Sequence, residues 1–386
     1  MKTIIKNARL VTRDSVIDGA CLLFENDTIS YIGKDECCAD KVIDVKGSYA
    51  VPGFVDIHCH GCLGLAFNGA SEDEVKKIAN YHLAHGTTTL IASTSTSEVS
   101  ELESSLEAIS NVIKDGGADS LSGIFMEGPW LSAAAAGAQA SVFMRKPSAD
   151  ELRLLKSKYP HLLRVGAAPE LDGADSFAET SVELGIVASI AHTDASFSDV
   201  EKSMKHGYKL MTHLYSGMRG TERKNAYRIA GAVEAGLYFD DMFVEIIADG
   251  KHLPYELLRY IYKFKGADRI CLITDAIRAA GLPNGSSTIG VSKVNNAHVW
   301  IEDDVAWVND RSCFAGSTAT TDRLYRTMAD AIGRDMPSLS RMASLTPAHL
   351  MGFYDRGELA VGKRADIVIL DDALGVEQVI IGGKEV

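Results

Sequence analysis

Residues 55–62 read VDIHCHGC, so two histidines flank one cysteine directly after an apolar run. Side chains alternate along an extended chain, so His58 and His60 point to one side and Cys59 to the other. Two imidazole nitrogens aimed at one point are typical of a metal site. We interpret His58 and His60 as candidate metal ligands and place Cys59 in the packing layer behind them.

Similar polar residues recur where later apolar runs end. A strand buried on both faces should be almost wholly apolar, and a single acid or histidine after such a strand is commonly a helix cap or a structural residue. Recurrence at the same position of several runs favours a metal centre instead. The residues concerned are Glu127, His192, His213 and Asp275, with His252 just beyond the seventh run. Such nitrogen and carboxylate donors suit one or two divalent ions per chain, Zn²⁺, Fe²⁺ or Mn²⁺.

Cys59 and Cys62 have CxxC spacing beside the two histidines, so a zinc knot is an alternative. The chain has no second CxxC pair, and its seven cysteines form no disulfide framework. We therefore expect reduced cysteines and a cytoplasmic protein. The N-terminus has no apolar core of a secretory signal, and no window approaches ~18 apolar residues.

The formal net charge of −13 is unfavourable for binding nucleic acid or an anionic membrane. This net charge is compatible with a small anionic substrate, because a local basic pocket can exist within an acidic surface. We therefore expect a small-molecule partner and neither a nucleic acid nor a membrane.

Eight apolar runs alternate with segments of helical periodicity, which predicts a (β/α)8 TIM-like barrel. In a barrel the carboxyl ends of all strands meet at one mouth, so polar residues far apart in sequence would share a centre. The runs lie at 51–60, 86–94, 121–129, 162–170, 186–192, 208–214, 242–250 and 269–276.

The chain ends have a different pattern from the middle. Residues 1–50 and 350–386 contain short alternating strands punctuated by Asn, Asp and Gly. We predict that they combine into one small β-sandwich domain, with the barrel spanning 51–349. A further β hairpin is expected as an insertion near 286–310.

The motifs DIHCHG, EGPW, IAHTDA, THLYSGM, IIADGKH and ITDAI resemble the amidohydrolase superfamily. Within it the chain looks similar to N-acetylglucosamine-6-phosphate deacetylases. The split β domain and the closing GELAVGKRADIVILD also resemble that superfamily. The resemblance implies a homodimeric enzyme that uses a metal to hydrolyse the N-acetyl group of an amino-sugar phosphate. The expected reaction converts N-acetyl-D-glucosamine 6-phosphate and water to D-glucosamine 6-phosphate and acetate.

Roles follow from the same resemblance, residue by residue. It implies that Glu127, His192 and His213 hold the principal metal, that His58 and His60 help to bind a second, and that Asp275 is the catalytic acid and base. An Arg from the loop 219–228 would reach the phosphate, often across a dimer interface. The implied substrate-binding residues are Ala138, Gln139, Ser216, Gly217, Arg223, Arg228, His252, Phe314, Ala315 and Gly316.

Two departures from the family pattern affect the substrate. The family usually has His where this chain has Gln139, and Asn-Ala where it has Ser216-Gly217. We therefore expect relaxed discrimination between gluco- and galacto-configured sugars. The alternatives are a deacetylase of N-acetylgalactosamine 6-phosphate or of an N-acyl amino acid, a nucleobase deaminase, and a non-catalytic sugar-binding relative.

Overall fold

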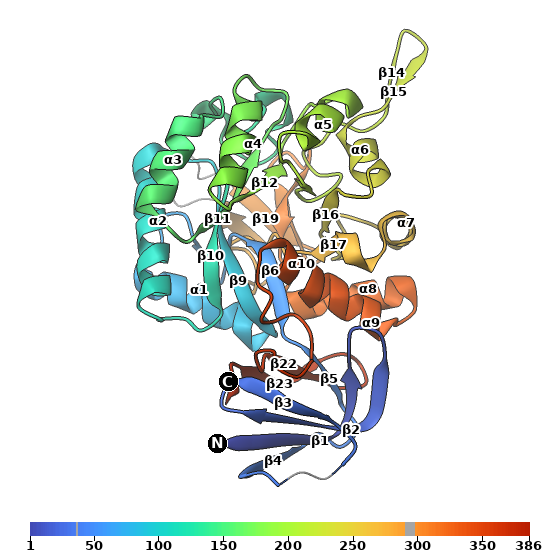
Figure 1. Cartoon of the computed structure of the whole chain (residues 1–386). Helices are drawn as coiled ribbons and strands as arrows, with labels where there is room; N and C mark the ends of the chain where they lie inside the picture. The colour runs from blue at the N-terminus through green and yellow to red at the C-terminus, as the bar shows by residue number, and fades with distance from the viewer. Residues whose placement is uncertain (36–37, 290–297) are drawn as a thin grey trace.

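The computed structural model describes residues 1–35, 38–289 and 298–386 (Figure 1). Its centre is an eight-stranded parallel sheet in the order β17-β16-β13-β12-β11-β10-β9-β6. A bridge between Cys59 and Ala276 joins the two ends of this order and closes the barrel. The eight predicted runs supply the eight strands, so the barrel prediction is confirmed. The strands are β6 (Phe54–Cys59), β9 (Thr87–Thr94), β10 (Leu121–Trp130), β11 (Leu162–Ala167), β12 (Val187–Ile190), β13 (Leu210–Met211), β16 (Phe243–Ile246) and β17 (Ile270–Leu272).

Helices surround the barrel and cover its strands (Figure 1). The first helix, α1 (Glu72–Ala84), shows why these segments are helical. Ser71 and Glu74 form a capping box at its start, and Val75, Ile78 and Ala79 make a buried stripe. The helices are α1 (Glu72–Ala84), α2 (Val99–Lys114), α3 (Ala149–Lys158), α4 (Ala174–Glu183), α5 (Phe197–Met204), α6 (Ala232–Tyr238), α7 (Tyr255–Lys265), α8 (Thr321–Ile332), α9 (Met336–Ser340) and α10 (Thr346–Leu350).

Strands from both chain ends form a second, mixed sheet below the barrel, with the two termini at its left side in Figure 1. β5 pairs antiparallel with β22, which joins the N-terminal strands to the C-terminal ones. The small β domain built from both ends is therefore confirmed. Its strands are β1 (Lys2–Val11), β2 (Val16–Glu25), β3 (Thr28–Gly33), β4 (Lys41–Asp44), β5 (Tyr49–Pro52), β22 (Ile367–Leu370), β23 (Val376–Ile381) and β24 (Lys384–Glu385).

The two parts share apolar packing. Val51 and Val368 of the terminal sheet belong to the same buried cluster as Phe54 at the start of the barrel. A continuous core fixes how the barrel sits on the sheet. The boundaries at 50/51 and 349/350 stay a proposal about domains, since this cluster spans the second of them and β5 runs across the first.

A four-stranded antiparallel sheet lies where a hairpin was expected near 286–310. It comprises β18 (Gly285–Thr288), β19 (His298–Glu302), β20 (Val305–Val308) and β21 (Phe314–Ser317), and residues 290–297 of the expected hairpin lie outside the described residues. β21 packs at the barrel mouth, because Ser317 N donates to Asp275 O at 2.9 Å. This pairing brings residues 314–316 to the mouth.

Two small hairpins complete the described chain. β7 (Gly61–Cys62) pairs with β8 (Leu65–Ala66) just after the first barrel strand, and β14 (Glu222–Lys224) pairs with β15 (Tyr227–Ile229). The β14–β15 hairpin projects away from the body of the molecule (Figure 1).

The described cysteines, which exclude Cys37, are all unpaired, in keeping with the expected reduced state. None of the helices that the structure describes is long and apolar enough to cross a membrane.

Candidate active site

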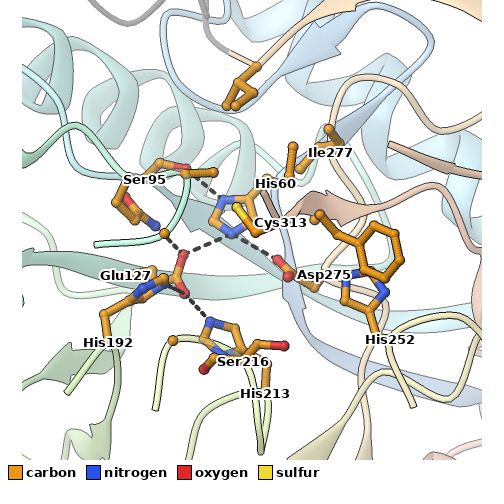
Figure 2. Close-up of a pocket in the computed structure, with 18 of the residues that line it drawn as sticks. His60, Ser95, Glu127, His192, His213, Ser216, His252, Asp275, Ile277 and Cys313 are labelled. Atoms are coloured by element: carbon orange, nitrogen blue, oxygen red, sulfur yellow. Dashed lines mark hydrogen bonds and ion pairs between the residues drawn. The ribbon is translucent and has the colours of Figure 1, made fainter. Parts of the chain in front are cut away.

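Four imidazole rings surround one buried carboxylate at the mouth of the barrel. Glu127 Oε1 lies 2.8 Å from His213 Nε2 and 3.2 Å from His192 Nε2, and Glu127 Oε2 lies 3.2 Å from His60 Nε2. His58 Nε2 approaches from below, 3.6 Å from Glu127 Oε1 and 3.0 Å from His60 Nε2. The structure thus brings together the five residues predicted as ligands, in two overlapping groups that share Glu127. Figure 2 shows four of them, His60, Glu127, His192 and His213.

Each of the four rings is oriented through its other nitrogen. Every Nδ1 faces an acceptor, so in the neutral ring it carries the proton and the Nε2 lone pair is directed at the centre. The acceptors are Glu245 Oε2 at 3.2 Å from His58, Ser93 O at 3.1 Å from His60, Ala135 O at 2.9 Å from His192 and Ser216 O at 3.1 Å from His213. This arrangement is typical of histidines that bind a metal, and the donor set fits a divalent transition metal.

The charges of the centre favour a cation. Burial lowers the pKa of His58, but neighbouring carboxylates, above all Glu127, raise it to about 10. Burial raises the pKa of Glu127, yet His58, His192 and His213 hold it well below its usual range. The carboxylates therefore stay ionised and attract positive charge into a site shielded from water.

Backbone strain is concentrated at the same place. His192, His213 and Asp275 have φ values of 42°, 30° and 46°, in the left-handed region that side chains with a Cβ rarely occupy. Each residue follows a barrel strand, so the left-handed step redirects its side chain toward the mouth. Residues held in strained conformations cluster at functional sites, where the surrounding structure imposes the geometry.

Asp275 lies beside the two histidines of the HxH motif. Its Oδ1 is 3.4 Å from His58 Nε2 and 3.3 Å from His60 Nε2. Burial raises the pKa of this carboxyl, and the two histidines outweigh that effect and hold it below its usual range. A charged carboxylate at this position can accept a proton from a neighbouring group.

These residues open into a pocket of about 330 Å³. His252 lines it, held through Nδ1 by Asp249 Oδ2 at 2.8 Å and packed against the Phe314 ring at a centroid distance of 4.8 Å. Figure 2 shows how the ligand group, Asp275 and His252 face this space. The predicted site residues along its wall are His60, Glu127, Ala138, Gln139, His192, His213, Ser216, Gly217, His252, Asp275, Phe314, Ala315 and Gly316.

Arg223 and Arg228 do not line the pocket. They face each other across the β14–β15 hairpin, and both side chains are exposed on its projecting arm. The described residues around the pocket include no Lys or Arg. The described residues of a single chain therefore place no Lys or Arg side chain on the pocket wall to bind a phosphate group.

The three residues at the two departures from the family pattern have defined surroundings. Gln139 donates from Nε2 to Glu127 Oε2 at 2.6 Å and accepts from Thr96 N at 2.8 Å, so its amide is tied to the ligand group. Ser216 supplies the backbone oxygen that orients His213. Gly217 has a φ of 58°, and a Cβ on it would lie 2.7 Å from His192 Nδ1, which makes glycine necessary there.

Several residues of the site were not found from the sequence. Ser95 and Cys313 belong to the pocket wall but sit in no motif, so no sequence signal marks them. Tyr215 and Ile277 also line the pocket, and they lie in the motifs THLYSGM and ITDAI, but the sequence analysis gave them no role. Glu245 is different, because it is an acid in the middle of the apolar run 242–250. A buried charge in a barrel strand needs a partner. The acid within this apolar run could therefore have identified Glu245 from the sequence.

Behind β6 the structure places a third group of potential ligands, formed by Asp56, Cys59 and His82. Cys59 Sγ lies 3.1 Å from His82 Nε2 of α1, on the side of the strand away from the pocket, as expected. The Asp56 carboxylate is hydrogen-bonded to the Thr274 hydroxyl at 2.5 Å. Cys62 is not part of this group, so the described residues give no support to a CxxC zinc knot.

Comparison with known proteins agrees with this geometry. The model of the amidohydrolase family matches residues 49–386. The chain is 31% identical to N-acetylglucosamine-6-phosphate deacetylase of Vibrio furnissii over 95% of its length and 90% of the relative. It is 29% identical to N-acetylgalactosamine-6-phosphate deacetylase of Escherichia coli O157:H7, over 100% of its length and 99% of the relative.

Solved structures give the same result. A mutant of N-acetyl-D-glucosamine-6-phosphate deacetylase from Mycobacterium smegmatis, in complex with N-acetyl-D-glucosamine-6-phosphate, superposes with a TM-score of 0.91. It is 30% identical and the match covers 100% of this chain and 99% of that one. The enzyme of the same name from Thermotoga maritima gives a TM-score of 0.87 at 30% identity, covering 99% of both chains. Family model, relatives and architecture agree, and the chain belongs to the amidohydrolase family.

Proposed function

We propose that the protein is a metal-dependent deacetylase that converts N-acetyl-D-glucosamine 6-phosphate and water to D-glucosamine 6-phosphate and acetate. The observation that carries the proposal is the convergence of four Nε2 atoms, Glu127 and Asp275 at one pocket. The named activity of the relatives at about 30% identity supports the substrate. In keeping with this role we expect a cytoplasmic enzyme.

Glu127, His192 and His213 would hold the principal metal, and His58 and His60 would contribute to a second position with Glu127 between them. A bound divalent metal supplies a water that is deprotonated near neutral pH and polarises the amide carbonyl. The buried surroundings strengthen these electrostatic effects, because little water is present to screen them.

Asp275 would act as general base and then as general acid. Its carboxylate accepts a proton from the attacking water and afterwards returns it to the nitrogen of the leaving amine. Glycine is favoured at position 316 beside Asp275, since its φ is 100° and a Cβ would lie 2.6 Å from Ile277 Cγ2 and 3.1 Å from Asp275 O. The left-handed backbone at Asp275 holds the carboxylate in place for both transfers.

The phosphate would be bound by residues of two chains. His252 provides a ring nitrogen from the chain that carries the pocket, with its other nitrogen fixed by Asp249. Arg223 and Arg228 do not line their own pocket and lie on the β14–β15 hairpin, which projects from the body of the molecule (Figure 1), and this hairpin could enter the pocket of a second copy. We therefore propose a homodimer in which each hairpin completes the partner's site.

The metal assignment predicts the behaviour of Glu127→Gln. The neutral amide removes the charge shared by both ligand groups, so the variant should lose bound metal and activity together. Elemental analysis of the purified variant and its parent, with turnover measured beside it, tests this. A parent that is fully active in excess chelator and contains no metal would contradict the assignment.

Asp275→Asn should keep the metal and the fold while losing turnover. Proton transfer by a placed group contributes about 10²–10⁴-fold, and here one carboxylate serves two transfers. The measurement is kcat together with metal content and melting temperature. If kcat stays within about threefold of the parent, a range well below that contribution, Asp275 has no part in the chemistry.

The shared phosphate site can be tested by mixing subunits. Arg223→Ala/Arg228→Ala should lose at least about tenfold in kcat/KM on the phosphorylated sugar, because charge-assisted hydrogen bonds contribute roughly 1.5–3 kcal/mol each. Refolding this variant together with Asp275→Asn should restore activity, since mixed dimers contain one complete site. Arg153→Ala, at an exposed arginine of α3, serves as the control. No recovery on mixing would place the phosphate contact within one chain.

The sugar configuration is a separate test. Gln139 is tied to Glu127 and Ser216 is shorter than the Asn usual in the family, so the wall near the hydroxyls discriminates weakly. One hydroxyl contact contributes about 0.5–1.5 kcal/mol, and the preference between gluco and galacto substrates should be less than about twentyfold. The measurement is kcat/KM for both epimers in the parent and in Gln139→His. A strong galacto preference would assign the protein to the alternative, N-acetylgalactosamine 6-phosphate.

A further inference from the structure

An ion pair lies inside the barrel beneath the candidate metal centre. Arg164 of β11 donates from Nη1 to Glu245 Oε1 of β16, and both side chains are fully buried. The interior of such a barrel is normally filled by branched apolar residues. Charges there lose their hydration, and a well-packed apolar pair would fill the same space without that cost.

The guanidinium of Arg164 is fixed in one position. It lies over the Phe125 ring at 3.7 Å from the centroid. Its donors reach Ile57 O at 3.1 Å, Thr212 Oγ1 at 2.9 Å and Ser189 Oγ at 3.2 Å. A planar guanidinium that is hydrogen-bonded to several strands restricts the position of the carboxylate it binds.

The second oxygen of Glu245 reaches upward to the centre. Glu245 Oε2 lies 3.2 Å from His58 Nδ1 and accepts from the backbone N of His213, also at 3.2 Å. An ionised carboxylate only accepts hydrogen bonds, so the Nδ1 of His58 must carry a proton, and in the neutral ring that a metal binds the lone pair is then on Nε2, which faces Glu127. Glu245 therefore contacts one member of each of the two ligand groups.

We propose that Arg164 and Glu245 are positioning residues for the metal centre, in which Glu245 orients His58 and His213 and Arg164 holds Glu245 in place. The inference rests on the proposed metal-dependent function. It adds a chain of contacts, from Arg164 through Glu245 to His58, that sets the geometry and affinity of the metal site from below.

The test compares metal affinity with stability. The parent, Glu245→Gln and Arg164→Met/Glu245→Gln are titrated with Zn²⁺ against a chromophoric chelator, and melting temperatures are measured without metal. Partners that orient ligands commonly change metal affinity by about 10–100-fold. We expect that loss in Glu245→Gln. The double variant should regain melting temperature, because no unpaired guanidinium is left buried, and should keep the weakened affinity.

Asp322→Asn is the matched control. Asp322 is another buried carboxylate, bound to Arg326 Nη1 at 2.8 Å and near His85, so its ion pairs within the described residues are not with the candidate ligands. Its loss should lower the melting temperature while Zn²⁺ affinity stays within about twofold of the parent, below the effect expected for an orienting partner. The absorption spectrum of Co²⁺-loaded protein gives a second readout, since it reports ligand geometry and should change only in the Glu245 variants.

Two results would overturn the inference. One is a Glu245→Gln variant whose Zn²⁺ affinity and Co²⁺ spectrum match the parent, which would leave the pair a structural role alone. The other is a double variant that regains both melting temperature and Zn²⁺ affinity, which would show that the metal site does not need the ion pair of Arg164 and Glu245. A parent that binds neither Zn²⁺ nor Co²⁺ would overturn the proposed function itself, and so separates the two failures.

Discussion

The buried carboxylate of Glu127 is the group on which the rest of the site depends. Its surroundings exclude water, so its negative charge is tolerated only because donors converge on it from several strands. The four histidines face the opposite constraint, since each needs an acceptor at Nδ1 to present Nε2 to the centre. A divalent cation satisfies both demands, because it neutralises the carboxylate and accepts the imidazole lone pairs.

The barrel makes this convergence possible without any local sequence contact. Parallel strands end at the same edge, so residues at 58, 127, 192, 213 and 275 meet although more than two hundred positions separate the first from the last. The left-handed backbone at His192, His213 and Asp275 then turns each side chain inward. Strain at these three strand ends is sustained because the closed barrel and its packed helices offer the backbone no alternative path.

The sequence was sufficient for the architecture and for the residues that interrupt apolar strands. The eight runs correspond to the eight strands because a buried parallel strand has a short, continuous apolar pattern. Ser95 and Cys313 could not be found in this way, since small residues on the pocket wall break no pattern. The direction of the β14–β15 hairpin, which carries Arg223 and Arg228, could not be predicted from the sequence either, because it depends on tertiary packing.

Arg164 and Glu245 show a different limit. Each is a charge within an apolar strand, 81 residues apart in sequence, and neither has a partner that the strand pattern identifies. Only the closed barrel, in which β11 and β16 face each other across the interior, brings them together. An ion pair at that place is unfavourable in isolation, and its contacts to His58 and His213 supply the reason for it. Residues that contradict the pattern of their own strand therefore point to the interactions across the barrel that support the active site.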